Sequence, residues 1–351
     1  MVPGVLMKLY LVLASVYNTA GAAAQRRGGW QRCAVEEFGA IPDDGQDDSS
    51  AISTALAHCD EVILPGPGVY DAKPMNLTSN QVLHIAYGAV LQAPTPARGQ
   101  CLNSKTSCPY RVVDSFPSYT GSRDFGTPCR LGPFIGAYRA RNLSITGGGV
   151  IDGAGKFFWD QASTMTIERP RLVELQFVED LNIGPISLRQ AAFWNLHPIY
   201  SQRLHIHDIR ITAEGGPNTD GIGNLRQPLP ALPNNSLRFF GRRLVMTVRC
   251  LSIAYTVTLH ILSDPDSCKD VLIENYYYNA GDDAIAVKSG WNYAGYHMNM
   301  SSENIYARNC SSNGRGGYTI GSEMSGGVRN VSFVDSTSTC SVRSMWHGFN
   351  C

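Results

Sequence analysis

Charge is scarce in this sequence, and neither sign is in excess. Charged residues make up 17% of the 351 residues, and 29 Lys and Arg balance 29 Asp and Glu. A neutral chain has no overall attraction to nucleic acid or to an anionic membrane surface, so we expect neither as a partner. After the first 24 residues, no apolar run free of charges is long enough to span a membrane. Helical periodicity is largely absent from residue 143 onward, which argues against an α-helical fold.

The N-terminus has the pattern of a secretory signal. Residues 1–24 contain Lys8, the apolar stretch "LYLVLASVY" and then small residues, with cleavage expected after Ala24. A membrane anchor is the alternative, but the apolar run is too short for one. Secretion to the extracellular space or cell wall would make the ten Cys disulfide partners and would suit the six N-glycosylation sequons. The sequons are at Asn76, Asn142, Asn234, Asn299, Asn309 and Asn330.

Short strand-like clusters recur along the chain. They are centred on Leu143, Leu181, Leu204, Val271, Ile305 and Val331. One cluster per repeat predicts a solenoid, and a single-stranded parallel β-helix is its natural form. The fourth residue after four of these positions is Asp or Asn: Asp208, Asn275, Asn309 and Asp335. These side chains would stack between coils, although the ordinary turn preference of Asn and Asp explains them almost as well.

Upstream of the repeats, one stretch has helical spacing. Ile52, Ala55, Leu56 and Cys59 follow a helical period, and Ser49 and Ser50 are available as caps. A short helix here would cover the open N-terminal end of the solenoid.

One interval breaks the repeat. Leu204 and Val271 are 67 residues apart, and removing Gly223–Ser263 leaves 26, the same as the interval from Ile305 to Val331. The segment 223–263 contains five Arg but no Asp, Glu or Lys. It is either a surface insertion or non-coding sequence read through in the gene, and its composition favours the second. The remaining residues 25–351 form one domain in this interpretation.

Three carboxylates are candidates for catalysis. Asp220 follows "NT", and Asp282 and Asp283 follow "NAG"; without segment 223–263, Asp220 and Asp282 are 21 residues, about one coil, apart. Neighbouring like charges raise the pKa of one carboxyl, which gives the proton donor and ionised base that glycosidic cleavage requires. Either motif alone would also fit an ordinary turn.

The motifs "NTDGI", "NAGDDAIAVKSG" and "IGSEMSGGVRNV" together resemble glycoside hydrolase family 28, the polygalacturonases and related pectin hydrolases. The resemblance implies a right-handed parallel β-helix, inverting hydrolysis of α-1,4-galacturonan, and no metal or other cofactor. It implies that Asp282 is the general acid and that Asp220 and Asp283 activate water. Asn218 would orient the base, and Lys288 would bind a galacturonate carboxylate or remain solvated.

Three further residues are candidates for contacts near the site. His197, in "FWNLHP", is either a substrate contact or a buried structural residue. Arg315 stands where many family members have a Gly-His-Gly histidine, so we expect it to contact a substrate carboxylate if that role is retained. The Arg-Ile-Lys motif of the family is missing, and Arg343 is the only cation near the expected place. The C-terminal coils are therefore expected to be incomplete.

Two other functions stay open at this stage. A pectate lyase shares the β-helix but needs a calcium site. A non-catalytic or inactive protein that binds pectin or the cell wall would suit the missing motif and the interrupted "NTDGI". The protein is expected to be a monomer. As written, the chain is expected to be poorly soluble and to have little activity, because the segment 223–263 contains the uncharged, β-prone run "LSIAYTVTLHIL".

Overall fold

The computed structural model describes residues 29–97, 100–102, 107–120, 129–213, 215–216, 218–219, 265–281, 283–314, 316–321 and 323–339. The expected signal peptide, the segment 223–263 and Arg343 lie outside these residues, as do Asp220, Asp282 and Arg315. No helix in the described ranges has the length and apolar character that a membrane crossing requires.

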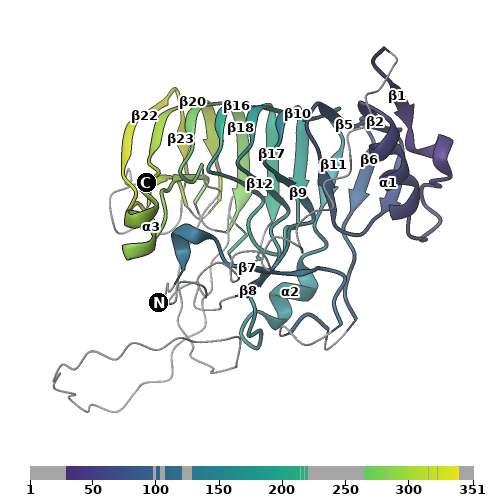
Figure 1. Cartoon of the computed structure of the whole chain (residues 1–351), viewed down its shortest axis with the longest axis horizontal. Coiled ribbons are helices and arrows are strands. Elements are labelled where there is room, and N and C mark those ends of the chain that lie inside the picture. Colours follow the sequence, from purple (N-terminus) through teal and green to yellow (C-terminus); the bar gives the residue numbers. More distant parts are fainter. Residues whose placement is uncertain are drawn as a thin grey trace, which may run out of the picture.

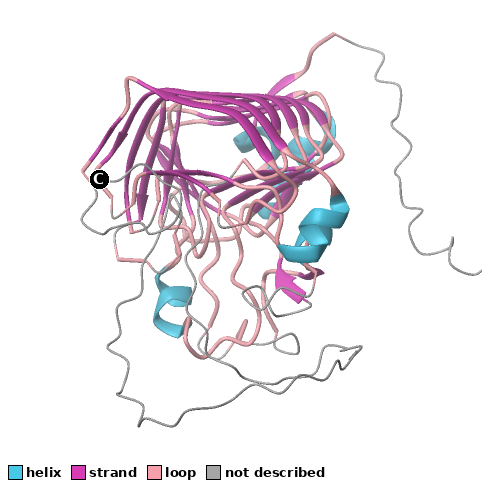
Figure 2. Ribbon diagram, turned by 90° about the vertical axis from the view of Figure 1, so that its left-hand side faces the viewer, coloured by secondary structure: helices cyan, strands magenta, loops and turns pink. Residues whose placement is uncertain are grey.

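The chain is wound into coils whose strands lie side by side along the long axis (Figure 1). Figure 2 looks roughly along this axis, so that the strands of successive coils lie one behind another. The largest sheet contains β1 (Arg32–Ala34), β2 (Glu61–Leu64), β3 (Gly68–Asp71), β5 (Gln81–Ile85), β6 (Ala89–Gln92), β10 (Arg141–Thr146), β11 (Val150–Asp152), β13 (Glu179–Ile183), β14 (Ile186–Arg189), β16 (Gln202–His207), β17 (Ile209–Ala213), β18 (Lys269–Ala280), β20 (Ser302–Ser312), β22 (Val328–Val334) and β23 (Thr337–Ser338). It makes up two faces of the solenoid.

A third face holds the strands that matter most for function. It consists of β4 (Met75–Leu77), β9 (Ile135–Tyr138), β12 (Val173–Gln176) and β15 (Leu196–Ile199), followed by β19 (Ile285–Val287) and β21 (Tyr318–Ile320). Single bridges from Ile199 to Asp266 and from Asp266 to Lys288 join β15 to β19. The remaining elements are β7 (Val112–Asp114), β8 (Cys129–Leu131), the helices α1 (Ser49–His58), α2 (Lys156–Gln161) and α3 (Asn292–Met298), and the short 3₁₀ turns η1 (Val35–Phe38) and η2 (Pro117–Tyr119).

The register confirms the repeat predicted from the sequence. The six predicted positions are paired in order, Leu143 with Leu181, Leu204, Val271, Ile305 and finally Val331. Alternate residues of these strands point inward, and the first five of the six positions are at most 2% exposed. The fold is therefore a right-handed parallel β-helix with a large apolar core inside the coils and a second, smaller apolar cluster around Trp194.

The predicted Asn and Asp positions form a ladder. Asn275 donates to Asp208 at 3.0 Å, and Asn309 donates to Asn275 at 2.7 Å. These residues and Asp335 all have φ near +50°, a left-handed conformation that Asn and Asp tolerate better than most residues. Both interpretations of the pattern are thus correct, since the residues make the turns and also stack between coils.

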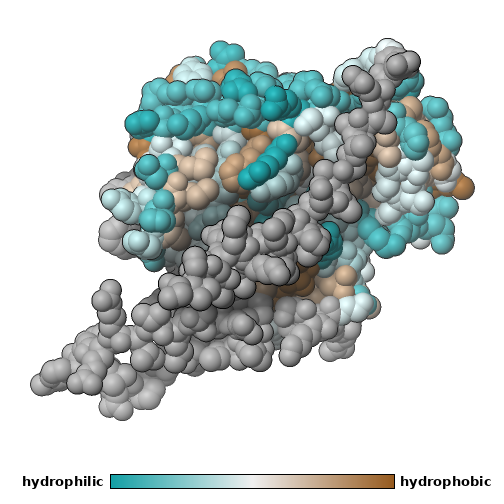
Figure 3. Space-filling view, viewed as in Figure 1, coloured by the Kyte–Doolittle hydropathy of each residue, from teal (hydrophilic) through white to brown (hydrophobic). Residues whose placement is uncertain are grey.

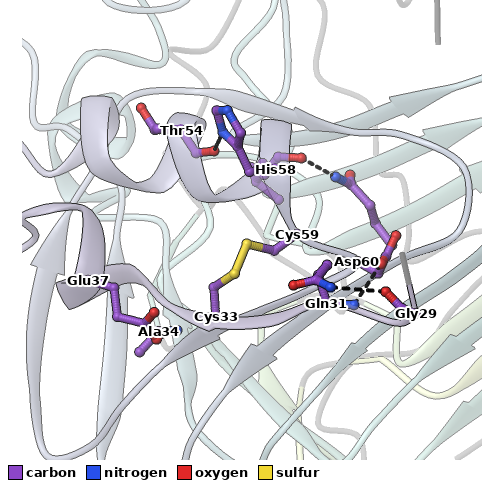
Figure 4. The surroundings of a disulfide bond; sticks show 11 residues. Gly29, Gln31, Cys33, Ala34, Glu37, Thr54, His58, Cys59 and Asp60 are labelled. Carbon is purple, nitrogen blue, oxygen red and sulfur yellow. Dashed lines mark hydrogen bonds between the residues drawn. A yellow bond between two sulfur atoms is a disulfide. The ribbon is translucent and has the colours of Figure 1, made fainter. Parts of the chain in front are cut away.

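The helix α1 covers the N-terminal end of the solenoid, as predicted (Figure 1). The disulfide Cys33–Cys59 ties its C-terminal end to β1 (Figure 4). The expected serine cap is wrong, however. Asp47 accepts a hydrogen bond from the Ser49 backbone, while the Ser49 hydroxyl accepts one from the Lys73 backbone.

Charges on the outside of the large sheet are paired across coils, and this upper edge of the molecule is largely hydrophilic (Figure 3). Arg203 contacts Glu179 at 2.9 Å, and Glu303 contacts Lys269 at 3.2 Å. A second disulfide, Cys101–Cys108, closes part of the Pro- and Ser-rich loop that precedes β7.

Deleting Gly223–Ser263 is expected to raise the soluble yield and the resistance to proteases. The strand β16, in the coil that contains the segment, and β18, in the next coil, are direct neighbours in register, so a 26-residue coil closes without it. Removal takes away an uncharged β-prone run. Limited proteolysis and soluble fraction after expression would test this. A full chain that is more soluble and more resistant than the deletion would show that the segment is a genuine structural element.

Candidate active site

The turn that leads to Asp220 is held firmly up to residue 219. The buried Thr219 hydroxyl lies 3.1 Å from the Ala213 carbonyl and 2.9 Å from that of Gly216. Gly216 packs flat against the indole of Trp159, where an added Cβ would lie 2.4 Å from Cε2. Trp159 projects from α2 and donates its own N–H to the Ala191 carbonyl at 2.9 Å. Only glycine fits at position 216, and the indole fixes the path of the turn.

Asn218 is oriented by an arginine that the sequence motifs did not indicate. One Arg169 nitrogen donates to the Asn218 side-chain oxygen at 2.5 Å, and another donates to the Ala192 carbonyl at 2.8 Å. Arg169 is 6% exposed and lies over the Phe193 ring at 4.8 Å. The guanidinium thus links the loop before β12 to the turn before Asp220. A usable signal was the pair of arginines in "ERPRLVE", directly before β12.

Asp283 stands at the start of β19. Its carboxylate accepts a hydrogen bond from the Thr319 hydroxyl of the following coil at 2.9 Å. Asp266 pairs with Lys288, which directly follows β19, and this pair sets the register between the Asp283 coil, called the Asp283 rung, and the coil before it. Counted along the sequence with segment 223–263 omitted, Asp220 is five residues before Asp266, just as Asp283 is five residues before Lys288.

Lys288 does not reach the surface. Its side chain is fully buried, and Nζ lies 3.0 Å from a Glu323 carboxylate oxygen and 4.9 Å from the centre of the Trp194 ring. Neither expected environment, a substrate carboxylate or solvent, is found here. The carboxylate that Lys288 binds belongs to the protein, and the pair ties the end of β19 to the next coil.

His197 is also fully buried, which agrees with the structural alternative. Trp194 and Phe116 present their rings edge-on at centroid distances of 4.5 and 5.2 Å. Asp266 lies 3.8 Å away. Burial lowers the pKa of His197 well below 6.5, and the charge of nearby Arg171 lowers it further. His197 is therefore neutral at neutral pH.

The outer side of β12 and β15 is covered by protein. Arg130 of β8 makes a bidentate pair with Glu174 at 2.8 and 2.9 Å, with 3% and 1% of the two side chains exposed. Above them, η2 brings Tyr119 into a hydrogen bond with Asp266. Burial raises the pKa of Asp266. In the coils before the Asp283 rung, the outer side of the third face is therefore covered by β8 and η2 and is not an open groove.

Lowering the pH from 7.5 to 5.5 is expected to destabilise the protein partly through His197. Below pH 6.5 the unfolded chain binds a proton that the folded chain, with its depressed pKa, does not. The stability falls by at most about 1.4 kcal/mol per pH unit from this residue. Denaturant midpoints of the parent and His197→Gln at three pH values would measure it. Parallel pH curves for the two proteins would contradict the assignment.

Comparison with known proteins confirms the resemblance noted in the sequence. Residues 121–226 match the family model described as "Glycosyl hydrolases family 28". A probable polygalacturonase of Vitis vinifera is 30% identical over 266 residues, which are 74% of this chain and 44% of the relative. An exopolygalacturonase of Zea mays is 27% identical over 41% of this chain and 35% of its own length. The chain thus spans less than half the length of these plant relatives.

Solved structures share the fold. An exopolygalacturonase from Thermotoga maritima has a TM-score of 0.63 at 23% identity, over 87% of this chain and 66% of its own. A polygalacturonase from Erwinia carotovora has a TM-score of 0.59 at 21% identity, over 88% and 69% of the two chains. At these identities the likeness concerns the β-helix alone.

Proposed function

We propose that this chain, which resembles the glycoside hydrolases of family 28, is a secreted polygalacturonase-like enzyme that cleaves α-1,4-galacturonosidic bonds of pectin. The observation that carries the proposal is the pairing of Asp266 with Lys288, from which we infer that Asp220 comes beside Asp283 once segment 223–263 is omitted. The similarity to named polygalacturonases supports the substrate class. The enzyme would act as a monomer in the cell wall.

The chemistry follows from the aligned carboxylates. Asp282 donates a proton to the leaving oxygen, while Asp220 and Asp283 activate water on the opposite side of the sugar, so that the anomeric configuration inverts. Thr319 holds Asp283, and Arg169 holds Asn218 beside the base. Arg315 is proposed to contact a substrate carboxylate. Lys288 and His197 are buried and support the site through their contacts with other protein side chains.

The covered third face favours attack at a chain end. A long polymer lying across the Asp283 rung would need free space over β12 and β15, where Glu174 and His197 are buried beneath η2. The name of the maize relative is consistent with this mode. The substrate would therefore extend from the rung in one direction only.

Three measurements on polygalacturonate, made with the chain lacking residues 223–263, test the proposal. Release of saturated reducing ends in the presence of a chelator supports hydrolysis, and unsaturated products support a lyase. NMR of the first product gives the anomer, and retention contradicts the assigned roles. The viscosity of the polygalacturonate solution is the third measurement, and it falls little for each bond cleaved if the enzyme attacks chain ends. Binding without any reducing-end release would favour the non-catalytic alternative.

Arg169→Gln is expected to reduce kcat by about 10²-fold, with KM changed little, because the variant loses the donor that fixes Asn218. Arg169→Lys should recover only part of the loss, since an ammonium cannot reproduce the planar two-way contact. Arg210→Gln, which removes an arginine from β17, is the control. Unchanged kcat in a folded Arg169→Gln protein would remove Arg169 from this role.

A further inference from the structure

Three consecutive coils carry large side chains at a corner where the chain turns left-handed. Arg139, Phe177 and Tyr200 have φ of 52°, 53° and 55°, and each follows a strand of the third face. The ladder described above places Asn and Asp in this conformation at another corner. For bulky residues such a backbone is an outlier, and an observed outlier of this kind often marks a functional surface.

The aromatic side chains at this corner form a row whose exposure to solvent increases from Tyr200 to Tyr138. Tyr200 is 5% exposed, and its hydroxyl contacts Ser118 of η2. Phe177 is half-buried against it at 4.8 Å, and Tyr138 meets Phe177 edge-on at 5.8 Å. Tyr138 itself is 59% exposed. The buried end of the series anchors the exposed ring.

A cation lies over these rings. The Arg139 guanidinium carbon is 5.4 Å from the Tyr138 ring centre and 5.7 Å from that of Phe177. Arg139 is exposed, and across the described part of the chain no carboxylate forms an ion pair with it. By contrast, Arg203, one corner further along the chain, is paired with both Glu179 and Asp180. The corner therefore offers a flat ring beside an uncompensated guanidinium.

We propose that Tyr138, Arg139 and Phe177 form a second polyuronate-binding surface, separate from the catalytic rung. Galacturonate combines a C–H-rich ring face, which an aromatic ring covers, with a carboxylate, which a guanidinium binds in a bidentate manner. The surface is at the carboxyl ends of the third-face strands, whereas Asp283 lies at an amino end, four coils beyond Tyr138 and three beyond Phe177. The choice of de-esterified galacturonan as ligand rests on the proposed function.

Retention of the full chain on immobilised polygalacturonate tests the proposal. Tyr138→Ala and Arg139→Gln are each expected to weaken binding by about three- to tenfold. Arg210→Gln is the matched control, because Arg210 also lies over a tyrosine, Tyr277, at 4.2 Å. Tyr296→Ala removes a 71% exposed ring from α3 and controls for the loss of an aromatic side chain.

The outcomes separate this surface from hydrolysis. The parent should bind methyl-esterified pectin as weakly as the Arg139→Gln variant binds polygalacturonate. In the chain lacking residues 223–263, trigalacturonate should be cleaved equally with and without Arg139→Gln. A parent that binds, but that releases no reducing ends even after residues 223–263 are removed, supports the surface and rejects the hydrolase. The proposal is overturned if Arg210→Gln weakens binding as much as Arg139→Gln, if a folded Tyr138→Ala protein binds normally, or if the parent does not bind.

Discussion

Replacing Asp282 with asparagine is expected to lower the rate on polygalacturonate by about 10²–10⁴-fold, the usual contribution of a general acid. The substitution keeps the shape of the side chain and removes the proton that the leaving oxygen needs. The experiment is done in the chain lacking residues 223–263, so that Asp220 and Asp283 can align. Initial rates of reducing-end release, measured with saturating substrate, give the effect.

The matched control is Asp160→Asn, which removes a carboxylate from α2 that pairs with Lys156 at 2.9 Å on the exposed surface. It should leave the rate unchanged. Near-normal turnover by Asp282→Asn would assign the acid role to another group. Equal losses in both variants would show that the effect is general and does not come from the site.

Glu174→Gln is expected to destabilise the folded chain by about 3–5 kcal/mol, because it removes the counter-charge of the buried Arg130 and leaves the buried Arg171 with Glu168 alone. Arg130 is bidentate to Glu174, and the fully buried Arg171 lies 3.6 Å from it. Burial alone would raise the pKa of Glu174, but these two cations outweigh it and hold the pKa below 4.5. Denaturant unfolding at pH 7 measures the change.

Glu179→Gln provides the comparison on the surface. Its carboxylate pairs with Arg203, but the two side chains are 44% and 46% exposed, so a loss within about 1 kcal/mol is expected. An apolar replacement of both partners, Arg130→Met with Glu174→Leu, should recover most of the stability lost in Glu174→Gln. A Glu174→Gln protein as stable as Glu179→Gln would mean that water reaches the pair.

Much of the fold could be predicted because the same short sequence pattern recurs in each coil of a solenoid. The apolar positions from Leu143 to Val331 and the ladder at Asp208 and Asn275 each follow from a few neighbouring residues and one spacing. The helix over residues 49–58 follows in the same way. Its cap was predicted wrongly because the Ser49 hydroxyl accepts a hydrogen bond from the distant Lys73 backbone, and no side chain of the described residues caps the first turn.

The surroundings of the site could not be predicted, because they depend on contacts between distant residues. Lys288 meets Glu323, and His197 meets Phe116, which lies on a loop with no repeat pattern. The link from Arg169 to Asn218 crosses 49 residues. A motif indicates that a side chain belongs near a site; whether it faces substrate or is packed behind the site depends on which loops cover it.

The ladder through Asp208, Asn275 and Asn309 also has a mechanical consequence. Each rung bonds only to the rungs beside it, as does each strand, so the molecule is close to a one-dimensional chain of coupled units. A defect in one coil raises the free energy of that coil and of its two interfaces, and its influence fades beyond them. Stress applied along the long axis would therefore separate the array at its weakest junction, with the coils on either side remaining wound.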